Sequence, residues 1–433
     1  MRLLARLDGC KAQFGHAAAR RAESLLKEAQ VWLIKHRRPR SADSLIHLHE
    51  TLLFLRAYPH SPRALRLCDE ILFGYSKWLW GLAPAELANF EYADVSGIAG
   101  TGLTTNFSYV FARSLASRHA NSLSIAWDRY PHVERLGPVL ARLIPEARED
   151  WAIAPHADWR KWFESTGGGV RWLLDRVSPE LYDLLEIPLR FELGDSEASR
   201  SRARIPRRSI FYHQRPLLSR RDVSIAAEFA TPPVRVTRLP LVSARRILGV
   251  IVDASAVRYR ELYGFEYPDE ARVFHAALGR GMDLFFCGVP RRWRLPHREY
   301  CAGMYFKNGI PMGYVEVMWA QSVMEVGFNL YYTFRQGETA WLYARLLKLF
   351  RQQFGVARFL VDPYQLGYGN DEAIESGAFW FYARLGFRSR SKRIRALADR
   401  EERRIAADPT YRTPPRILRK LAAAPMVYHI GKS

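Results

Sequence analysis

The chain has 433 residues, 48% of them hydrophobic and 13% aromatic, which is enough apolar material for about two or three packed cores. Its net charge of +21 at pH 7 favours acidic partners such as nucleic acid, an anionic membrane surface or a phosphate-bearing cofactor. Because no run of about eighteen uncharged apolar residues occurs, the sequence argues against a transmembrane segment.

The first part of the chain, residues 1–187, is expected to be mainly helical. Apolar residues recur at three- and four-residue spacing over 17–35 and 44–57, and a proline-containing turn then leads into a third helix over 63–80. No signature in this region identifies a chemistry. One hypothesis for its role is an interaction module that brings the rest of the chain to a protein partner.

A glycine-rich stretch within this region, SGIAGTG at residues 96–102, has the GxxGxG spacing of some phosphate-binding loops. Such a loop must follow a strand, and no clear strand precedes this one. We therefore interpret the stretch as a flexible turn and not as a phosphate site.

The pattern changes in the second segment, residues 188–242. Short β-like runs flank a polar, arginine-rich stretch at 195–208, which is expected to form an exposed loop or linker. A helix over 243–262 is expected to follow.

The last third of the chain has the clearest pattern. Asn308-Gly309 joins two apolar runs, which is the strongest short signal for a β-hairpin, and Gly355 stands where a left-handed residue would end a helix. The predicted elements are strands over 300–307, 312–319 and 323–332, a helix over 338–354, a strand over 357–361 and a helix over 371–385. This order is an antiparallel meander followed by a parallel crossover.

Two motifs in this part of the chain match a known family. FYARLGF at residues 381–387 follows the pattern at the end of that family's second helix, and MEVGF at residues 324–328 follows its central strand. Together with the order of elements, they resemble the GNAT superfamily of acyl-CoA-dependent N-acyltransferases over residues 300–389. The resemblance implies an α+β protein with a helical N-terminal region followed by a GNAT-like mixed-sheet C-terminal domain.

The expected organisation of the chain has four segments. They are a mainly helical region of residues 1–187, a β-rich or linker segment of residues 188–242, a GNAT-like acyltransferase domain of residues 243–395 and a basic C-terminal tail of residues 396–433. The tail alternates charged and apolar residues and lacks clustered large aromatics. This pattern favours packing against the rest of the protein over contact with a membrane or nucleic acid.

The resemblance implies that the protein binds acyl-CoA, either acetyl-CoA or a longer thioester. A helix N-terminus supplies the N–H donors and the positive dipole that a pyrophosphate needs. The expected contacts are Asn329, Leu330 and Tyr331 for the pantetheine, and Arg335, Gln336, Gly337, Thr339 and Ala340 for the pyrophosphate. Glu338 departs from the family, which has glycine there, and its carboxylate would repel a pyrophosphate unless it turned outward.

The resemblance assigns Tyr382 as the acid that protonates the leaving thiolate, a role within reach of a phenol with a pKa of about 10. The alternative is that Tyr382 is a core aromatic. Glu316 and Glu325 are candidate general bases, because a carboxylate on a half-buried sheet has a raised pKa. The alternative is that both face solvent. Asp362, at the end of the next strand, is another carboxylate that could reach a substrate amine.

Cys10, Cys68, Cys287 and Cys301 are widely spaced and lack the paired spacing of a zinc or redox site. We expect four buried free thiols, no metal site and a reducing compartment. The charged N-terminal residues do not form the apolar core of a signal peptide, so the expected location is cytoplasmic.

The main hypothesis is an acyltransferase that moves an acyl group from acyl-CoA, or a related thioester, to an amine acceptor. The alternative is a catalytically inactive GNAT-like binding or regulatory protein. It would contact nucleic acid, an anionic membrane or a protein partner through its basic surface. An arginine-rich surface that contacts only water would explain the charge without any partner.

Overall fold

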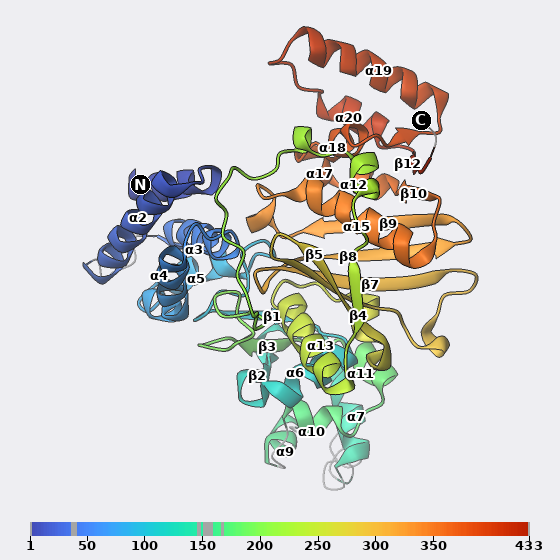
Figure 1. Cartoon of the computed structure of the whole chain (residues 1–433). Coiled ribbons are helices and arrows are strands. Elements are labelled where there is room, and N and C mark those ends of the chain that lie inside the picture. Colours follow the sequence, from blue (N-terminus) through green and yellow to red (C-terminus); the bar gives the residue numbers. More distant parts are fainter. Residues whose placement is uncertain (1, 36–40, 145–148, 150–158, 166–168, 432–433) are drawn as a thin grey trace. The chain divides into compact units, whose positions relative to one another are not determined.

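The computed structural model describes the chain except for residues 1, 36–40, 145–148, 150–158, 166–168 and 432–433 (Figure 1). The chain is a mixed α and β protein with a large mixed sheet. It divides into two compact units. Unit 1 comprises Met1–Lys11, His16–Pro206 and Arg245–Glu266, and unit 2 comprises Ala12–Gly15, Arg207–Ala244 and Tyr267–Ser433.

Unit 1 is built around α3 (Ala42–Ala57), a helix that is buried on almost all sides. α4 (Pro62–Phe73) packs against both α3 and α2 (His16–Lys35). The helices predicted over 17–35 and 44–57 are confirmed. The helix predicted over 63–80 is shorter, because it ends at Phe73 and gives way to a 3-10 turn at Tyr75–Trp78.

Serine side chains start two of these helices. The Ser41 hydroxyl accepts a hydrogen bond from the Ser44 N–H at 3.3 Å, and the Ser61 hydroxyl accepts one from the Ala64 N–H at 3.0 Å. Pro62 then occupies the first position of α4, where its missing N–H costs nothing.

Unit 1 also contains a small antiparallel sheet with the order β1-β3-β2. Its strands are β1 (Gly102–Thr105), β2 (Leu123–Ile125) and β3 (Leu189–Glu192). The sequence predicts β3 but not β1 or β2. The other helices with bounds in this unit are α1 (Arg2–Asp8), α5 (Pro84–Leu87), α6 (Tyr109–Arg118), α7 (Leu136–Leu143), α9 (Trp159–Ser165), α10 (Val170–Leu174), α11 (Pro179–Leu185) and α14 (Tyr263–Glu266). α13 (Leu241–Ala256) replaces the helix predicted over 243–262 and belongs mainly to unit 1.

The polar stretch at 195–208 is a loop, as predicted, but its predicted exposure is wrong. Ser199, Arg200 and Ser201 are almost completely buried. Arg200 can be buried because it forms an ion pair with Glu50, whose carboxylate oxygen lies 2.7 Å from the Arg200 guanidinium.

Unit 2 is built on a nine-stranded sheet with the order β11-β12-β10-β9-β8-β7-β6-β5-β4. The strands are β4 (Arg235–Arg238), β5 (Val273–Gly279), β6 (Met282–Cys287), β7 (Glu299–Lys307), β8 (Ile310–Ala320), β9 (Val323–Leu330), β10 (Arg358–Val361), β11 (Arg388–Ser389) and β12 (Met426–His429). All neighbouring pairs are antiparallel except β9 and β10, which are parallel. The predicted hairpin is confirmed, with φ of 50° at Asn308 and 86° at Gly309.

The helix predicted over 338–354 is confirmed as α15 (Thr339–Phe354), which ends at Gly355 with a φ of 64°. Figure 1 shows α15 (orange) beside the sheet. The single helix predicted over 371–385 is wrong. It is divided into α17 (Asp371–Glu375) and α18 (Ala378–Arg384), because Gly377 adopts a left-handed conformation with a φ of 67°. The remaining helices of this unit are α12 (Ile225–Ala230), α16 (Pro363–Leu366), α19 (Lys392–Ala407) and α20 (Pro415–Leu421).

The basic tail packs into unit 2, as its alternating pattern predicts. Its last strand, β12, lies between β10 and β11 and pairs with both.

The two compact units divide the chain differently from the predicted four segments. Residues Arg245–Glu266 pack in unit 1, whereas the four-segment organisation places them at the start of the third segment. The functional division into four segments stays a prediction. The described parts of the chain contain no helix long and apolar enough to cross a bilayer.

Candidate functional site

The candidate site is a pocket of about 190 Å³ on the sheet of unit 2. Its walls come from β7, β8 and β9 and from the turn that follows β10. It is lined by Tyr300, Glu316, Met318, Glu325, Val326, Gly327, Asp362, Tyr364 and Gln365. Three of these nine residues are carboxylic acids, and both glutamates are the candidate bases predicted from the sequence.

The strand register brings these side chains to one face of the sheet. Glu316 on β8 lies opposite Gly327 on β9, and Glu325 on β9 lies opposite Met318. Since side chains two apart on a strand share a face, Glu316, Met318, Glu325 and Gly327 all belong to the same face. Gly327 leaves room on this face. A Cβ added to it would lie 3.5 Å from its nearest neighbour, the Glu316 carbonyl oxygen, which is an ordinary van der Waals distance.

The opposite face of β9 carries core side chains. Phe328 packs against Tyr343 of α15, with ring centroids 5.1 Å apart, and is buried together with Met324. α15 therefore covers the face of β9 that does not carry Glu325. The two glutamates lie on the other, less buried face of the sheet, and both are partly buried.

Glu316 is held by a neighbouring phenol. Tyr300 on β7 donates its hydroxyl to Glu316 Oε1. Burial raises the pKa of Glu316, and the hydrogen bond from Tyr300 partly opposes that rise. The raised pKa brings this carboxylate closer to the range in which it can exchange a proton near neutral pH.

Glu325 lies in a more strongly charged environment. Burial raises its pKa, the neighbouring Asp362 carboxylate raises it further, and the Arg298 guanidinium lowers it. Arg298 Nη1 lies 4.0 Å from Glu325 Oε2. Asp362 is oriented by the start of α16, because its Oδ1 accepts the Tyr364 N–H at 2.8 Å.

Next to this pocket the pairing of the two parallel strands ends. The β9–β10 ladder joins only three residue pairs, the last of which is Leu360 with Glu325. β10 then ends at Val361 and the chain turns into α16, whereas β9 continues to Leu330 in contact with β8. Among the described residues, the second half of β9 therefore has a paired strand only on its β8 side.

The residues predicted to hold pantetheine lie on this second half of β9 or just after it. Asn329 is half-buried, and its carbonyl oxygen accepts the Tyr305 hydroxyl. Leu330 and Tyr331 are buried. The Tyr331 N–H donates to the Met312 carbonyl oxygen at 2.8 Å and is thus used within the protein.

The residues predicted to hold pyrophosphate surround the start of α15. Arg335 forms an ion pair with Glu372, and Gln336 is exposed. The Gly337 N–H donates to the Phe334 carbonyl oxygen at 2.9 Å. Thr339 and Ala340 are the first two residues of α15, so their N–H groups have no acceptor within the helix.

Glu338 does not turn outward. Its side chain is fully buried and accepts hydrogen bonds from the Arg280 guanidinium and from the Leu218 N–H, the latter at 3.1 Å. Lys307 Nζ lies 3.6 Å from Glu338 Oε2. Two cations therefore offset the negative charge that a pyrophosphate would otherwise meet at this position.

Tyr382 on α18 lies in an aromatic cluster and does not line the pocket. Its ring centroid is 5.5 Å from that of Tyr343 and 5.9 Å from that of Phe387, and Phe381 packs on its edge. Burial raises the pKa of Tyr382. The contacts are those of a core aromatic, and the catalytic role of Tyr382 stays a prediction.

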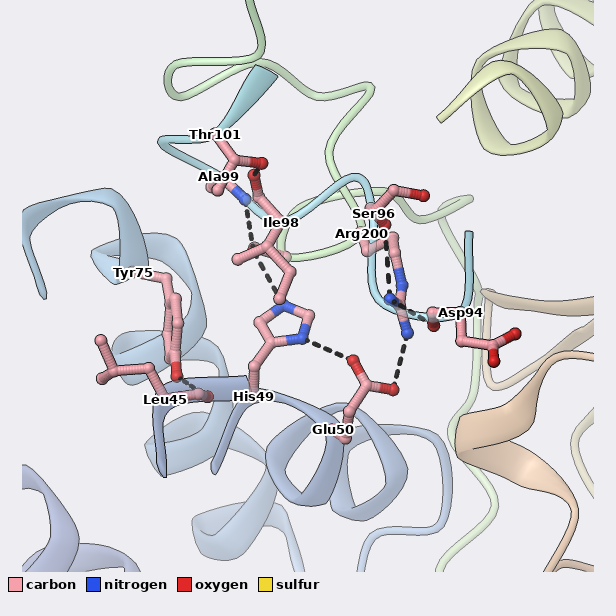
Figure 2. A network of polar contacts seen from close by, with 11 residues as sticks. Leu45, His49, Glu50, Tyr75, Asp94, Ser96, Ile98, Ala99, Thr101 and Arg200 are labelled. Carbon is pink, nitrogen blue, oxygen red and sulfur yellow. Dashed lines mark hydrogen bonds and ion pairs between the residues drawn. The ribbon is translucent and has the colours of Figure 1, made fainter. Parts of the chain in front are cut away.

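Unit 1 contains a second polar cluster, which the sequence analysis does not identify (Figure 2). His49 Nε2 lies 2.9 Å from Ser201 Oγ, and His49 Nδ1 lies 3.2 Å from Glu50 Oε1. Glu50 Oε2 accepts a hydrogen bond from Arg200 at 2.7 Å. The sequence signals of this cluster are the adjacent His49-Glu50 pair on a predicted helix and the arginine-rich stretch at 195–208. All four residues are buried, so we interpret the cluster as a connection between α3 and the loop at 195–208.

The glycine-rich stretch SGIAGTG forms a turn that packs against this cluster. Its Ala99 N–H donates to Ser201 Oγ at 3.0 Å, and Arg200 donates to the Ser96 carbonyl oxygen at 3.3 Å. Ser96, Ile98 and Ala99 are completely buried. The predicted turn is present at residues 99–100, but it is buried and its polar groups are used by protein contacts.

Replacing Gly100 by alanine is expected to lower the free energy of unfolding by about 2–5 kcal/mol. Its φ is 86°, and an added Cβ would lie 2.7 Å from the Ser76 Cα. Gly81→Ala is the matched control, since Gly81 has a φ of 88° with no atom within 4 Å of an added Cβ. Urea unfolding followed by circular dichroism measures both variants. Equal losses would show that the conformation alone, without the contact, determines the cost.

The described part of the chain contains no group of three or more His, Cys, Asp or Glu residues arranged to hold a metal ion. The four cysteines are free and buried, as predicted. Comparison with known protein families, with curated proteins and with solved structures finds no match in any of the three.

Proposed function

We propose that unit 2 transfers an acyl group from acyl-CoA, either acetyl-CoA or a longer thioester, to an amine acceptor. The observation that carries this proposal is the end of the parallel β9–β10 pairing beside a pocket lined by carboxylates. The meander followed by a parallel crossover, with the FYARLGF and MEVGF motifs, supports a GNAT-like arrangement of this unit.

The second half of β9 would hold the pantetheine. Residues 326–330 have one backbone edge without a strand partner among the described residues, and such an edge can bind the amide groups of an extended ligand. The N–H groups of Thr339 and Ala340, at the start of a sixteen-residue helix, would bind the pyrophosphate together with Arg335. Arg335 would exchange Glu372 for the phosphate.

The chemistry needs a neutral amine. In the transfer, the amine nitrogen attacks the thioester carbonyl, a C–N bond forms, the C–S bond breaks and the thiolate leaves. Glu325 accepts the proton that the amine loses, because its raised pKa makes it a better base than an exposed carboxylate. The thiolate takes up a proton, for which Tyr382 is the candidate donor.

Binding of acetyl-CoA, longer acyl-CoAs and free CoA tests the first step. We expect these ligands to raise the midpoint of thermal unfolding, by about 2.7 kcal/mol of stabilisation at a hundredfold excess over the Kd. Arg335→Glu should remove the shift, whereas Arg393→Glu, an exposed site on α19, should keep it. If no thioester or CoA shifts the midpoint of the unaltered protein, the proposed activity is wrong.

One observation favours a second candidate function, which is binding of an anionic partner such as nucleic acid or a membrane surface. α19 buries only Ile394 and Glu401 and presents six exposed cationic side chains. They belong to Lys392, Arg393, Arg395, Arg400, Arg403 and Arg404. This function would be favoured if the protein bound no thioester but shifted nucleic acid in electrophoresis, and if that shift weakened steeply with salt.

A further inference from the structure

The pocket of unit 2 concentrates negative charge in a protein with a net charge of +21. Glu316, Glu325 and Asp362 line one cavity of about 190 Å³. The ion pair that Glu325 makes is a long one, with Arg298 at 4.0 Å. The Asp362 carboxylate raises the pKa of Glu325, so holding these two charges together costs free energy, and a cationic ligand in the cavity would lower that cost.

An aromatic side chain at the same cavity adds an independent preference for a cation. Tyr364, on α16, lines the pocket and remains 55% exposed, although it is a large apolar side chain. The face of a phenol ring attracts an organic cation that lies within about 6 Å of its centroid. The adjacent Gln365 lines the pocket as well and adds a neutral polar group.

We propose that the amine acceptor carries a second cationic group, and that it is a small aliphatic diamine or polyamine. The reacting nitrogen lies next to Glu325, and the second cationic group binds to Asp362 and the ring of Tyr364. The size of the cavity suits the end of a narrow aliphatic chain better than a bulky ring system. The transfer step of this inference rests on the proposed function, but the binding of the diamine does not.

The transfer is balanced without a further reactant. One nitrogen of the diamine gives up a proton to the Glu325 carboxylate and forms a bond to the acyl carbon. The thioester loses its thiolate, which takes up a proton. The second nitrogen keeps its proton and its charge throughout, so that Asp362 holds the same cation before and after transfer.

Three ligands of equal chain length test the binding: 1,4-diaminobutane, butylamine and 4-aminobutanoate. They carry a positive, a neutral and a negative group at the second end. Isothermal titration calorimetry with the full chain, in the absence of any thioester, is expected to show binding of the diamine about tenfold or more tighter than that of butylamine. The anionic 4-aminobutanoate should bind most weakly.

Asp362→Asn identifies the contact. Asparagine caps a helix as well as aspartate does, so α16 is expected to remain formed. This variant should bind diaminobutane and butylamine with similar affinity, whereas Glu402→Gln, an exposed site on α19, should leave the tenfold preference unchanged. Glu325→Gln should reduce acetyl transfer to the diamine.

The outcomes separate the two proposals. If butylamine or 4-aminobutanoate binds as tightly as diaminobutane, or if Asp362→Asn keeps the preference, the inference about the second cation is overturned, whatever the thioesters do. If the preference is present but no thioester binds, the diamine site stands and the acyl transfer is overturned.

Discussion

Arg200→Met is expected to destabilise unit 1 by about 3–5 kcal/mol. Arg200 is 2% exposed and its partner Glu50 is 8% exposed. The substitution removes the guanidinium that lies 2.7 Å from Glu50 Oε2 and leaves a buried carboxylate without it. It also removes the hydrogen bonds that Arg200 donates to the Asp94 and Ser96 carbonyl oxygens at 3.2 and 3.3 Å (Figure 2).

Hydrogen exchange measured by mass spectrometry, at increasing urea, follows the peptides of each unit separately. Peptides of α3 and of the loop at 195–208 should lose protection at lower urea in the variant. Arg190→Met is the matched control, because Arg190 and Asp128 form an ion pair in the same unit with side chains 36% and 63% exposed. We expect that control to cost less than about 1 kcal/mol. Similar losses in the two variants would contradict the role assigned to burial.

The double variant Glu50→Gln with Arg200→Met refines this result. It removes both charges, so no buried carboxylate is left without its cation, and the loss should be smaller than that of Arg200→Met alone. His49 is buried beside Glu50, and burial lowers the pKa of its imidazole, which favours the neutral ring at neutral pH. The double variant therefore leaves His49 as an uncharged partner of Ser201.

The fold of unit 2 was predictable where local signals were strong. Asn308-Gly309 adopts the two positive φ angles of a tight hairpin, and Gly355 ends α15 in a left-handed conformation. The break at Gly377 was not predictable, because apolar residues recur on both sides of it with helical spacing. Whether a glycine continues a helix or ends it depends on packing that the sequence pattern does not contain.

The site was predictable only in part, because of a register shift in the hairpin. Counting pairs outward from Asn308-Gly309 would place Tyr300 opposite Val317, on the face away from Glu316. An irregularity between Tyr305 and Phe306 moves the register by one residue, so that Tyr300 lies opposite Met318 instead. That shift brings the Tyr300 hydroxyl to Glu316. Sequence patterns select carboxylates as candidates, but they do not show which neighbours reach them.

The burial of charged side chains was the least predictable feature of the sequence. Arg200 and Glu338 both lie in polar stretches where an exposed side chain is the natural expectation, and both are buried. Each is buried because a partner far away in the sequence offsets its charge, Glu50 for Arg200 and Arg280 for Glu338. Pairing of this kind depends on tertiary contacts, so no local pattern reveals it.

Glu338→Ala is expected to destabilise unit 2 by about 3–5 kcal/mol. The variant removes the only carboxylate that the described contacts place beside both Arg280 and Lys307. Burial lowers the pKa of the Lys307 ammonium to about 7, and Glu338 opposes that fall. Without Glu338, the cost of burying Lys307 in its charged form increases. The Leu218 N–H loses its acceptor as well.

Glu372→Ala is the matched control, since Glu372 pairs with Arg335 near the same helix but is 51% exposed. We expect that control to cost less than about 1 kcal/mol in urea unfolding. Glu338→Gln should fall between the two, because its amide keeps an oxygen that can accept the Leu218 N–H but loses the charge. If Glu338→Ala unfolds at the same urea concentration as Glu372→Ala, then the buried contacts of Glu338 do not hold the start of α15.

Glu338→Gln also tests acyl-CoA binding, because α15 begins at Thr339, the residue after Glu338. If this variant loses acyl-CoA binding while its stability is unchanged, the Glu338 carboxylate also positions the N–H groups of Thr339 and Ala340.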